Sequence, residues 1–176
     1  MTIGACVLSA LAIAGASDRG SGISDDAHAV RRAAMALEKS VENSASLFGE
    51  KASALSQLAA VVNTAIDESR EFSGADLPDP LAVTRAADLL RALPKWSASP
   101  EFSVQPDGSI ELDWMPAKTR IFSISVSTSN RLAFSWLNGS EITHGVAWFD
   151  GSTVPAAVLF YLQAIHSDGS ATLRAA

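Results

Sequence analysis

The sequence predicts an α+β fold in which an Ala-rich helical half precedes an antiparallel sheet and a closing helix. Most alanines of the 176-residue chain precede Pro94, whereas Phe48 and Phe72 are the only aromatic residues that do. Apolar residues recur at helical spacing before Pro94 and alternate with polar residues after it. Helices and strands segregated in this way indicate a helical region at 1–93 and a sheet region at 94–176.

The N-terminal segment 1–17 carries no charged side chain and contains the lone cysteine, Cys6. We expect an apolar helix that is retained in a cytoplasmic protein, because no Lys or Arg precedes the apolar run as in a signal peptide. The alternative is an exported protein with residues 1–16 as the signal peptide. A membrane anchor is disfavoured because the segment is short and rich in Ala and Gly.

Residues 24–72 carry apolar residues at intervals of three and four, which is the heptad-like spacing of packed helices. We call this set the apolar seam; its members are Val30, Ala34, Leu37, Val41, Ala45, Phe48, Ala52, Leu55, Ala59, Val62 and Ile66. A further helix is expected over 79–93, with Asp79 as its N-cap and Pro80 in its first turn. Pro94 ends it.

The length and the partner of the seam helix stay open. Either one helix spans 24–72, or the residues Ser44 to Gly49 break it into an antiparallel hairpin. The seam packs either on helices of the same chain or on a second copy as a coiled coil. In the second case Val41, Phe48 and Leu55 contact the partner.

Five antiparallel strands in meander order are expected between Pro94 and the last helix. Gln105-Pro106-Asp107-Gly108 has the residues of a type I turn and predicts the first hairpin. The last hairpin is expected to have a three-residue loop, Leu137-Asn138-Gly139, which pairs Phe134 with Ile142. This register places Val146, His144 and the other alternating residues of the last strand on the core side.

The C-terminal helix is predicted from Pro155 to Ile165 and is apolar on every side. One face, with Val158, Leu162 and Ile165, can cover the sheet. Leu159, Phe160 and Tyr161 then need a second cover, which is either the helical half or a partner protein.

Charge and motifs exclude several functions. The net charge of −6 and the absence of a basic cluster argue against nucleic-acid binding. No nucleophile elbow, phosphate-binding loop or Cys-rich metal motif occurs, and we predict no cofactor and no metal. The weak catalytic candidates are His144 with Glu141 or Asp150, and His144 is also explained as a hydrogen-bonded core histidine.

These observations predict a non-catalytic protein–protein interaction or assembly subunit, of the adaptor or immunity type. It would form a homo-oligomer through its helices or bind a protein partner through its sheet or its C-terminal helix. One alternative is a small hydrolase or metal-dependent enzyme centred on His144. Another is an exported ligand-binding domain.

Overall fold

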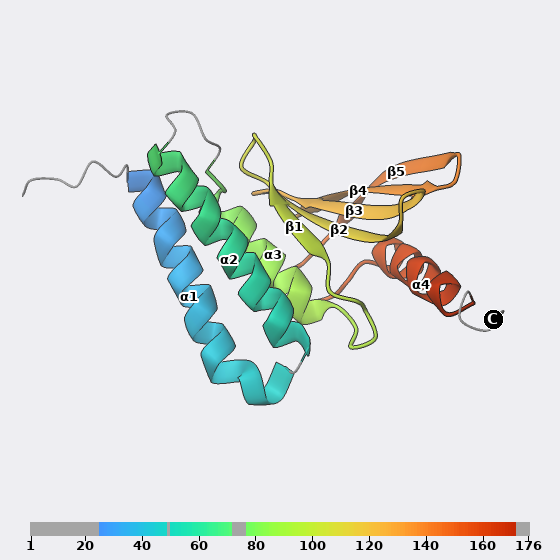
Figure 1. Ribbon diagram of the computed structural model, residues 1–176, viewed down its shortest axis with the longest axis horizontal. Coiled ribbons are helices and arrows are strands. Elements are labelled where there is room, and N and C mark those ends of the chain that lie inside the picture. The colour runs from blue at the N-terminus through green and yellow to red at the C-terminus, as the bar shows by residue number, and fades with distance from the viewer. Residues whose placement is uncertain (1–24, 49, 72–76, 172–176) are drawn as a thin grey trace, which may run out of the picture.

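The computed structural model describes residues 25–48, 50–71 and 77–171, and shows three helices, a five-stranded sheet and a fourth helix in chain order (Figure 1). The predicted α+β class is confirmed. The expected helix at 1–17 and Cys6 lie outside the described residues, so retention or cleavage of that segment stays a prediction. Among the described helices none has both the length and the apolar character needed to cross a bilayer.

Helices α1 (Asp25–Phe48) and α2 (Glu50–Glu71) lie side by side as a hairpin, which is the second of the two predicted arrangements (Figure 1). Helix α1 ends at Phe48 and α2 begins at Glu50, and Gly49 between them lies outside the described residues. Seam residues are buried along both helices, namely Val30, Ala34, Leu37, Leu55, Ala59, Val62 and Ile66. Since the chain itself covers these described seam residues, a coiled coil with a second copy is not needed to bury them.

Helix α3 (Pro80–Ala92) begins as predicted. The carboxylate of Asp79 accepts hydrogen bonds from the backbone N–H groups of Leu81, at 2.7 Å, and Ala82, at 3.4 Å. Such an N-cap satisfies N–H groups that have no partner within the helix.

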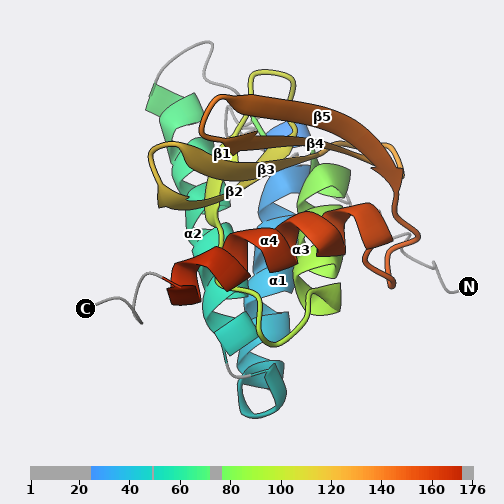
Figure 2. The ribbon, with the colours of Figure 1, turned by 90° about the vertical axis from the view of Figure 1, so that its right-hand side faces the viewer.

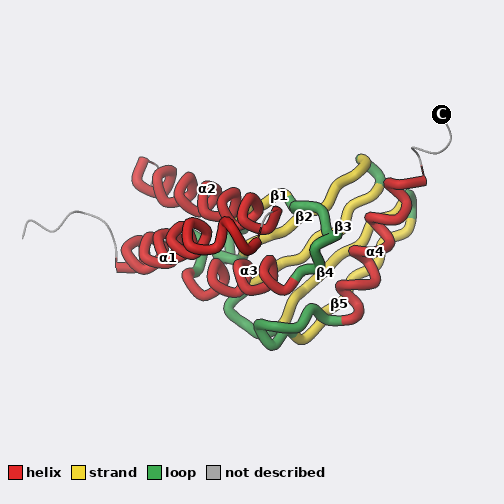
Figure 3. Tube along the Cα trace, turned by 90° about the horizontal axis from the view of Figure 1, so that it is seen from below, coloured by secondary structure: helices red, strands yellow, loops and turns green. Residues whose placement is uncertain are grey.

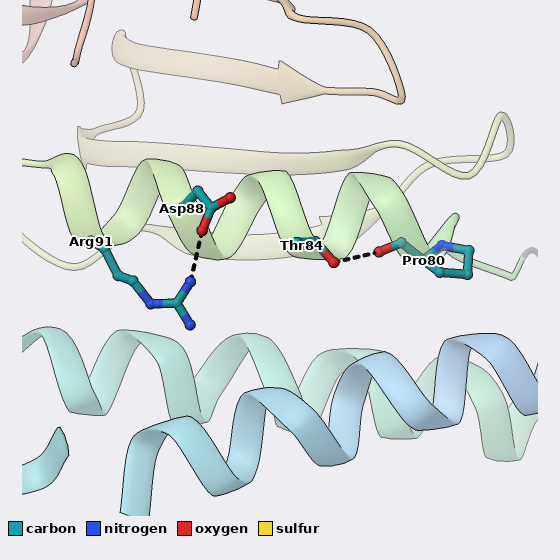
Figure 4. Close-up of polar contacts among 4 residues, drawn as sticks. All are labelled: Pro80, Thr84, Asp88 and Arg91. Atoms are coloured by element: carbon teal, nitrogen blue, oxygen red, sulfur yellow. Dashed lines mark hydrogen bonds and ion pairs between the residues drawn. The ribbon is translucent and has the colours of Figure 1, made fainter. Parts of the chain in front are cut away.

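A partly exposed side of α3 carries local polar contacts (Figure 4). The Thr84 hydroxyl donates to the Pro80 carbonyl at 2.9 Å, and Arg91 pairs with Asp88 at 2.8 Å. The opposite side is apolar and packs in the core through Ala82, Val83, Ala86, Ala87, Leu89 and Leu90.

The sheet is an antiparallel meander in the order β1-β2-β3-β4-β5, as expected. Its strands are β1 (Glu101–Val104), β2 (Ile110–Ala117), β3 (Arg120–Val126), β4 (Arg131–Asn138) and β5 (Glu141–Trp148). The predicted turn joins β1 to β2, where the Gly108 N–H donates to the Gln105 carbonyl at 2.9 Å. Gly108 has a φ of +78°, a conformation that favours glycine.

The two faces of the sheet have different surroundings. Helix α3 and helix α4 (Ala156–Ala171) pack on one side, which we call the inner face (Figures 2 and 3). The inner face and the helical hairpin share one continuous core. No described element covers the other side, which we call the outer face (Figure 2).

The predicted register of the last hairpin is wrong. Phe134 pairs with Gly145, not with Ile142, and Asn138 pairs with Glu141. The loop therefore consists of Gly139 and Ser140, and the φ of +64° at Gly139 suits the first central residue of a type II′ turn. Because side chains alternate along a strand, this shift turns the even-numbered residues of β5 to the outer face.

Packing between Phe134 and Gly145 explains the observed register. A Cβ atom added to Gly145 would lie 2.8 Å from two ring carbons of Phe134, so the ring occupies the space that a side chain would need. The Tyr161 ring of α4 lies 5.5 Å from the Phe134 ring and fills the same region of the inner face. The inward positions of β5 therefore hold small residues: Thr143, Gly145 and Ala147.

Candidate functional site

Leu55 is the one predicted partner-binding residue of the hairpin whose side chain the structure describes. Leu55 is only 1% exposed and belongs to the core, so its assignment to a partner surface is wrong for this subunit. The side chains of Val41 and Phe48 lie outside the described part of the structure. The hairpin therefore offers no described apolar stripe for a second copy at the seam.

Helix α4 divides its apolar residues between the core and the solvent. Val158, Leu162 and Ile165 are buried against the sheet, as predicted. Leu159 is partly buried, and the Tyr161 ring stacks on the Phe122 ring at a centroid distance of 5.6 Å. Phe160 is 64% exposed, so it is the one large member of the predicted partner-binding set that the described structure leaves open.

The catalytic candidates do not converge. His144 and Glu141 are exposed on opposite faces of β5, roughly 10 Å apart along the strand. Asp150 lies beyond the strand and accepts hydrogen bonds from the N–H groups of Ser152 and Thr153. Those two bonds, with Thr153 contributing most, lower the pKa of Asp150 and assign it to the turn before α4.

His144 is not the buried core histidine that its expected parity suggested, because the corrected register places it outward. Its cross-strand neighbour is Ser135, and no hydrogen bond joins the two side chains. Asp113 is the nearest carboxylate in the line of paired residues that crosses the sheet from His144. It accepts a hydrogen bond from Ser123 instead. A Ser-His-Asp triad needs the acid to orient the imidazole, and this arrangement does not provide that contact.

Two rows of side chains cross the outer face from β1 to β5. One row is Ser103, Glu111, Ser125, Ala133 and Val146, and the other is Glu101, Asp113, Ser123, Ser135 and His144. The face thus changes from acidic on β1 and β2, through small and hydroxyl side chains on β3 and β4, to larger side chains on β5. The small side chains lie at the bottom of a shallow depression of about 470 Å³.

Carboxylates at the acidic side interact with neighbours on the same face. Partial burial, and then the charge of Asp113, raise the pKa of Glu111. The side-chain amide of Gln105 donates to Glu111 and partly opposes that rise. A carboxyl group whose negative charge is disfavoured by its surroundings would gain from a nearby cation.

The apolar side of the depression is formed by the edge strand β5. Ile142 is 65% exposed, Val146 54% and Trp148 68%. All three are on the outer face, whereas the sequence placed Ile142 and Val146 in the core. This surface was not predicted, because the expected register placed every large apolar residue of the strands on one side.

A second depression, of about 400 Å³, lies between β2 and α4. Its aromatic groups are engaged within the chain: the Trp114 indole N–H donates to the Ala98 carbonyl at 2.8 Å, and His166 lies beside the Trp96 ring at 5.7 Å. Nowhere among the described residues do three His, Cys, Asp or Glu side chains gather as a metal site requires. The outer face is therefore the better candidate for function.

Comparison with protein-family models, with curated proteins and with solved structures finds no match to this chain. The function must therefore be argued from the outer face itself.

Proposed function

We propose that this chain is a non-catalytic protein-interaction subunit that binds a partner protein through the outer face of its sheet at β5. One observation carries the proposal: an edge strand of eight residues exposes Ile142, Val146 and Trp148 on the same side. Large apolar side chains gathered on a surface mark interaction sites, whereas single exposed ones do not.

The composition of β5 supports the same reading. Edge strands of monomeric proteins are usually protected by Lys, by Pro, by inward-pointing charges or by being short. Strand β5 is eight residues long and has no Lys or Pro, and its one charged residue, Glu141, lies at its start on the inner side, away from Val146 and Trp148. Covering its three large apolar side chains would contribute about 1.5–3 kcal/mol each, which is enough to support specific binding.

Oligomerisation through the helices is not part of this proposal, because most of the described seam residues are buried within the chain. The C-terminal helix, predicted as a second docking element, exposes Phe160 as its large apolar side chain. Phe160 therefore serves as a matched control for Trp148, since the two side chains are aromatic and similarly exposed.

The test compares the tagged wild-type chain with Trp148→Ser and Phe160→Ser after purification from the native host. We expect a stoichiometric partner, or a second copy of the chain, with the wild type and with Phe160→Ser but not with Trp148→Ser. Circular dichroism of each variant checks that the fold is retained. A wild-type monomer of 18.4 kDa by light scattering, with no partner recovered, would contradict the proposal.

A further inference from the structure

The outer face forms a trough between two walls. Its floor is made of small side chains on β3 and β4, namely Ser123, Ser125, Ala133 and Ser135. Glu111 of β2 lines one wall, which Asp113 continues along the same face of the strand, and His144 and Val146 of β5 line the other. Three strand spacings separate the walls, or about 14 Å.

An α-helix fits these dimensions. Its diameter with side chains is about 10–12 Å, so it can lie along the floor between the walls. The small floor residues allow its backbone to approach the sheet closely. A strand that merely extended the edge of β5 would use the backbone of that edge and would leave both the floor and the acidic wall without a role.

Charge is distributed unevenly across the trough. Glu101 extends the acidic side from β1, where it is the cross-strand partner of Asp113, and like charges in such a pair repel. Arg131 is a cation of the outer face, but it is the cross-strand partner of Trp148 and does not lie in a row with Glu111 or Asp113. The carboxylates of β1 and β2 therefore have no cation in their own two rows across the sheet.

We infer that the trough binds an amphipathic helix of a partner protein, with Lys or Arg along the side that meets Glu111 and Asp113. Large apolar side chains of that helix then contact Val146 and Trp148 of β5. The inference rests on the proposed function and names its partner by chemistry: a basic, amphipathic helical segment. Complementary charge sets the orientation of the helix in the trough, and the apolar contact supplies most of its affinity.

The test uses two synthetic, fluorescein-labelled helical peptides that carry the same leucine stripe. One has a stripe of Lys beside the leucines, and the other has Glu at those positions. Anisotropy titrations with the full chain should show the Lys peptide binding at least tenfold more tightly. Its affinity should fall as salt is raised, because exposed charges are screened.

Variants locate the binding. Glu111→Gln with Asp113→Asn should weaken binding of the Lys peptide by roughly three- to tenfold, since both changes keep the shape of the side chains and remove two partly buried charges. The control is Asp26→Asn with Glu68→Gln, which removes the same charge from exposed positions on the hairpin and should leave affinity unchanged. Amide shifts of Ser123, Ser135 and Val146 in spectra of the labelled protein should follow the titration.

The outcomes separate this inference from the proposed function. Absence of Lys-peptide binding at 100-fold excess, or equal binding of the Glu peptide, overturns the basic-helix inference. If the natural partner is lost with Trp148→Ser but retained with Glu111→Gln and Asp113→Asn, the docking surface stands and the acidic wall is not part of it. Retention of the natural partner by Trp148→Ser overturns both.

Discussion

The inner and outer faces of the sheet are built from the same strands but are completed in different ways. On the inner face, β2, β3 and β4 contribute large apolar side chains that α3 and α4 cover, with Phe122 at the centre of a group of rings. On the outer face the same strands carry acids, serines and alanine along most of their length, with Ile121 and Leu137 beside Ile142 at one end, and β5 adds the most exposed large apolar residues. The difference shows that Val146 and Trp148 of β5 do not follow the polarity of the residues beside them on β4, Ala133 and Arg131.

Exposure of large residues on β5 follows from crowding on the inner face. The ring of Phe134, packed beside Tyr161, leaves no room for a side chain at the inward position of Gly145. Protein interiors are densely packed, so that position takes a residue without a side chain. The large residues on the other side of β5 are then free of a structural role in the core and can be retained for binding.

Replacement of Phe122 by Ala should have the largest effect on stability. Phe122 is fully buried and lies 5.7 Å from the Trp114 ring and 5.6 Å from the Tyr161 ring. We expect Phe122→Ala to lower the free energy of unfolding by about 3–5 kcal/mol, measured by urea denaturation. A loss below about 1.5 kcal/mol would mean that the inner face is not the core of the sheet.

Gly145→Ala tests the register of the last hairpin. In the observed register the new methyl group meets the Phe134 ring, and we expect a loss of about 1–3 kcal/mol in unfolding free energy. In a register with Gly145 outward, the same change would be neutral or slightly stabilising, because alanine loses less entropy than glycine on folding. The Phe134→Leu background should reduce the loss and serves as the control.

Trp148→Ser should have only a small effect on the isolated chain. Because the side chain is 68% exposed, we expect the unfolding free energy to change by less than about 1 kcal/mol. The measurement is the same urea titration as for Phe122→Ala, so the two faces are compared directly. A loss as large as that of Phe122→Ala would place Trp148 in the core and remove it from the docking surface.

Glu111→Gln should change the free energy of unfolding least, and it should raise this free energy where the other variants lower it. Partial burial and the charge of Asp113 raise the pKa of Glu111 in the folded chain, so its ionisation at neutral pH opposes folding. We expect Glu111→Gln to raise the unfolding free energy by no more than about 1 kcal/mol at pH 7. The same variant should lower the affinity of the chain for a basic partner.

The advantage of Glu111→Gln should depend on pH. The wild-type Glu111 becomes protonated as pH falls through its raised pKa, so the penalty of its charge disappears at low pH. Below the ordinary glutamate pKa of about 4.3 the two proteins should have similar stability. An advantage that stays constant from pH 7 to pH 4 would show that the charge is not its cause.

Local signals were sufficient for much of the fold. The N-cap at Asp79 and the turn at Gln105–Gly108 were predicted because each depends on a few adjacent residues. The inward parity of β2, β3 and β4 was predicted because large apolar residues recur at every second position there, with Ile121 and Leu137 as the exceptions on the outer face. The hairpin of α1 and α2 was left open, since glycine alone costs only about 1 kcal/mol in a helix and does not decide a break.

The candidate site was not predictable in the same way. Its apolar side depends on a two-residue loop at Gly139 and on the fit of the Phe134 ring over Gly145, which are contacts between strands. Its acidic side depends on the rows that bring Glu111 and Asp113 beside the serines of β3. Phe160 and Tyr161 are adjacent in the sequence and equally apolar in pattern, yet only the packing of α4 shows which one is exposed.

By itself the sequence determined the α+β class, the order of the elements and the inner face of three strands. These properties follow from periodicity and capping, which act over a few residues along the chain. Only the tertiary structure decided the register of β5 and the use of the apolar seam within one chain. Both depend on which surfaces are covered by segments distant in sequence. Because the hydrophobic effect is non-directional, an apolar residue does not indicate in the sequence which segment will cover it.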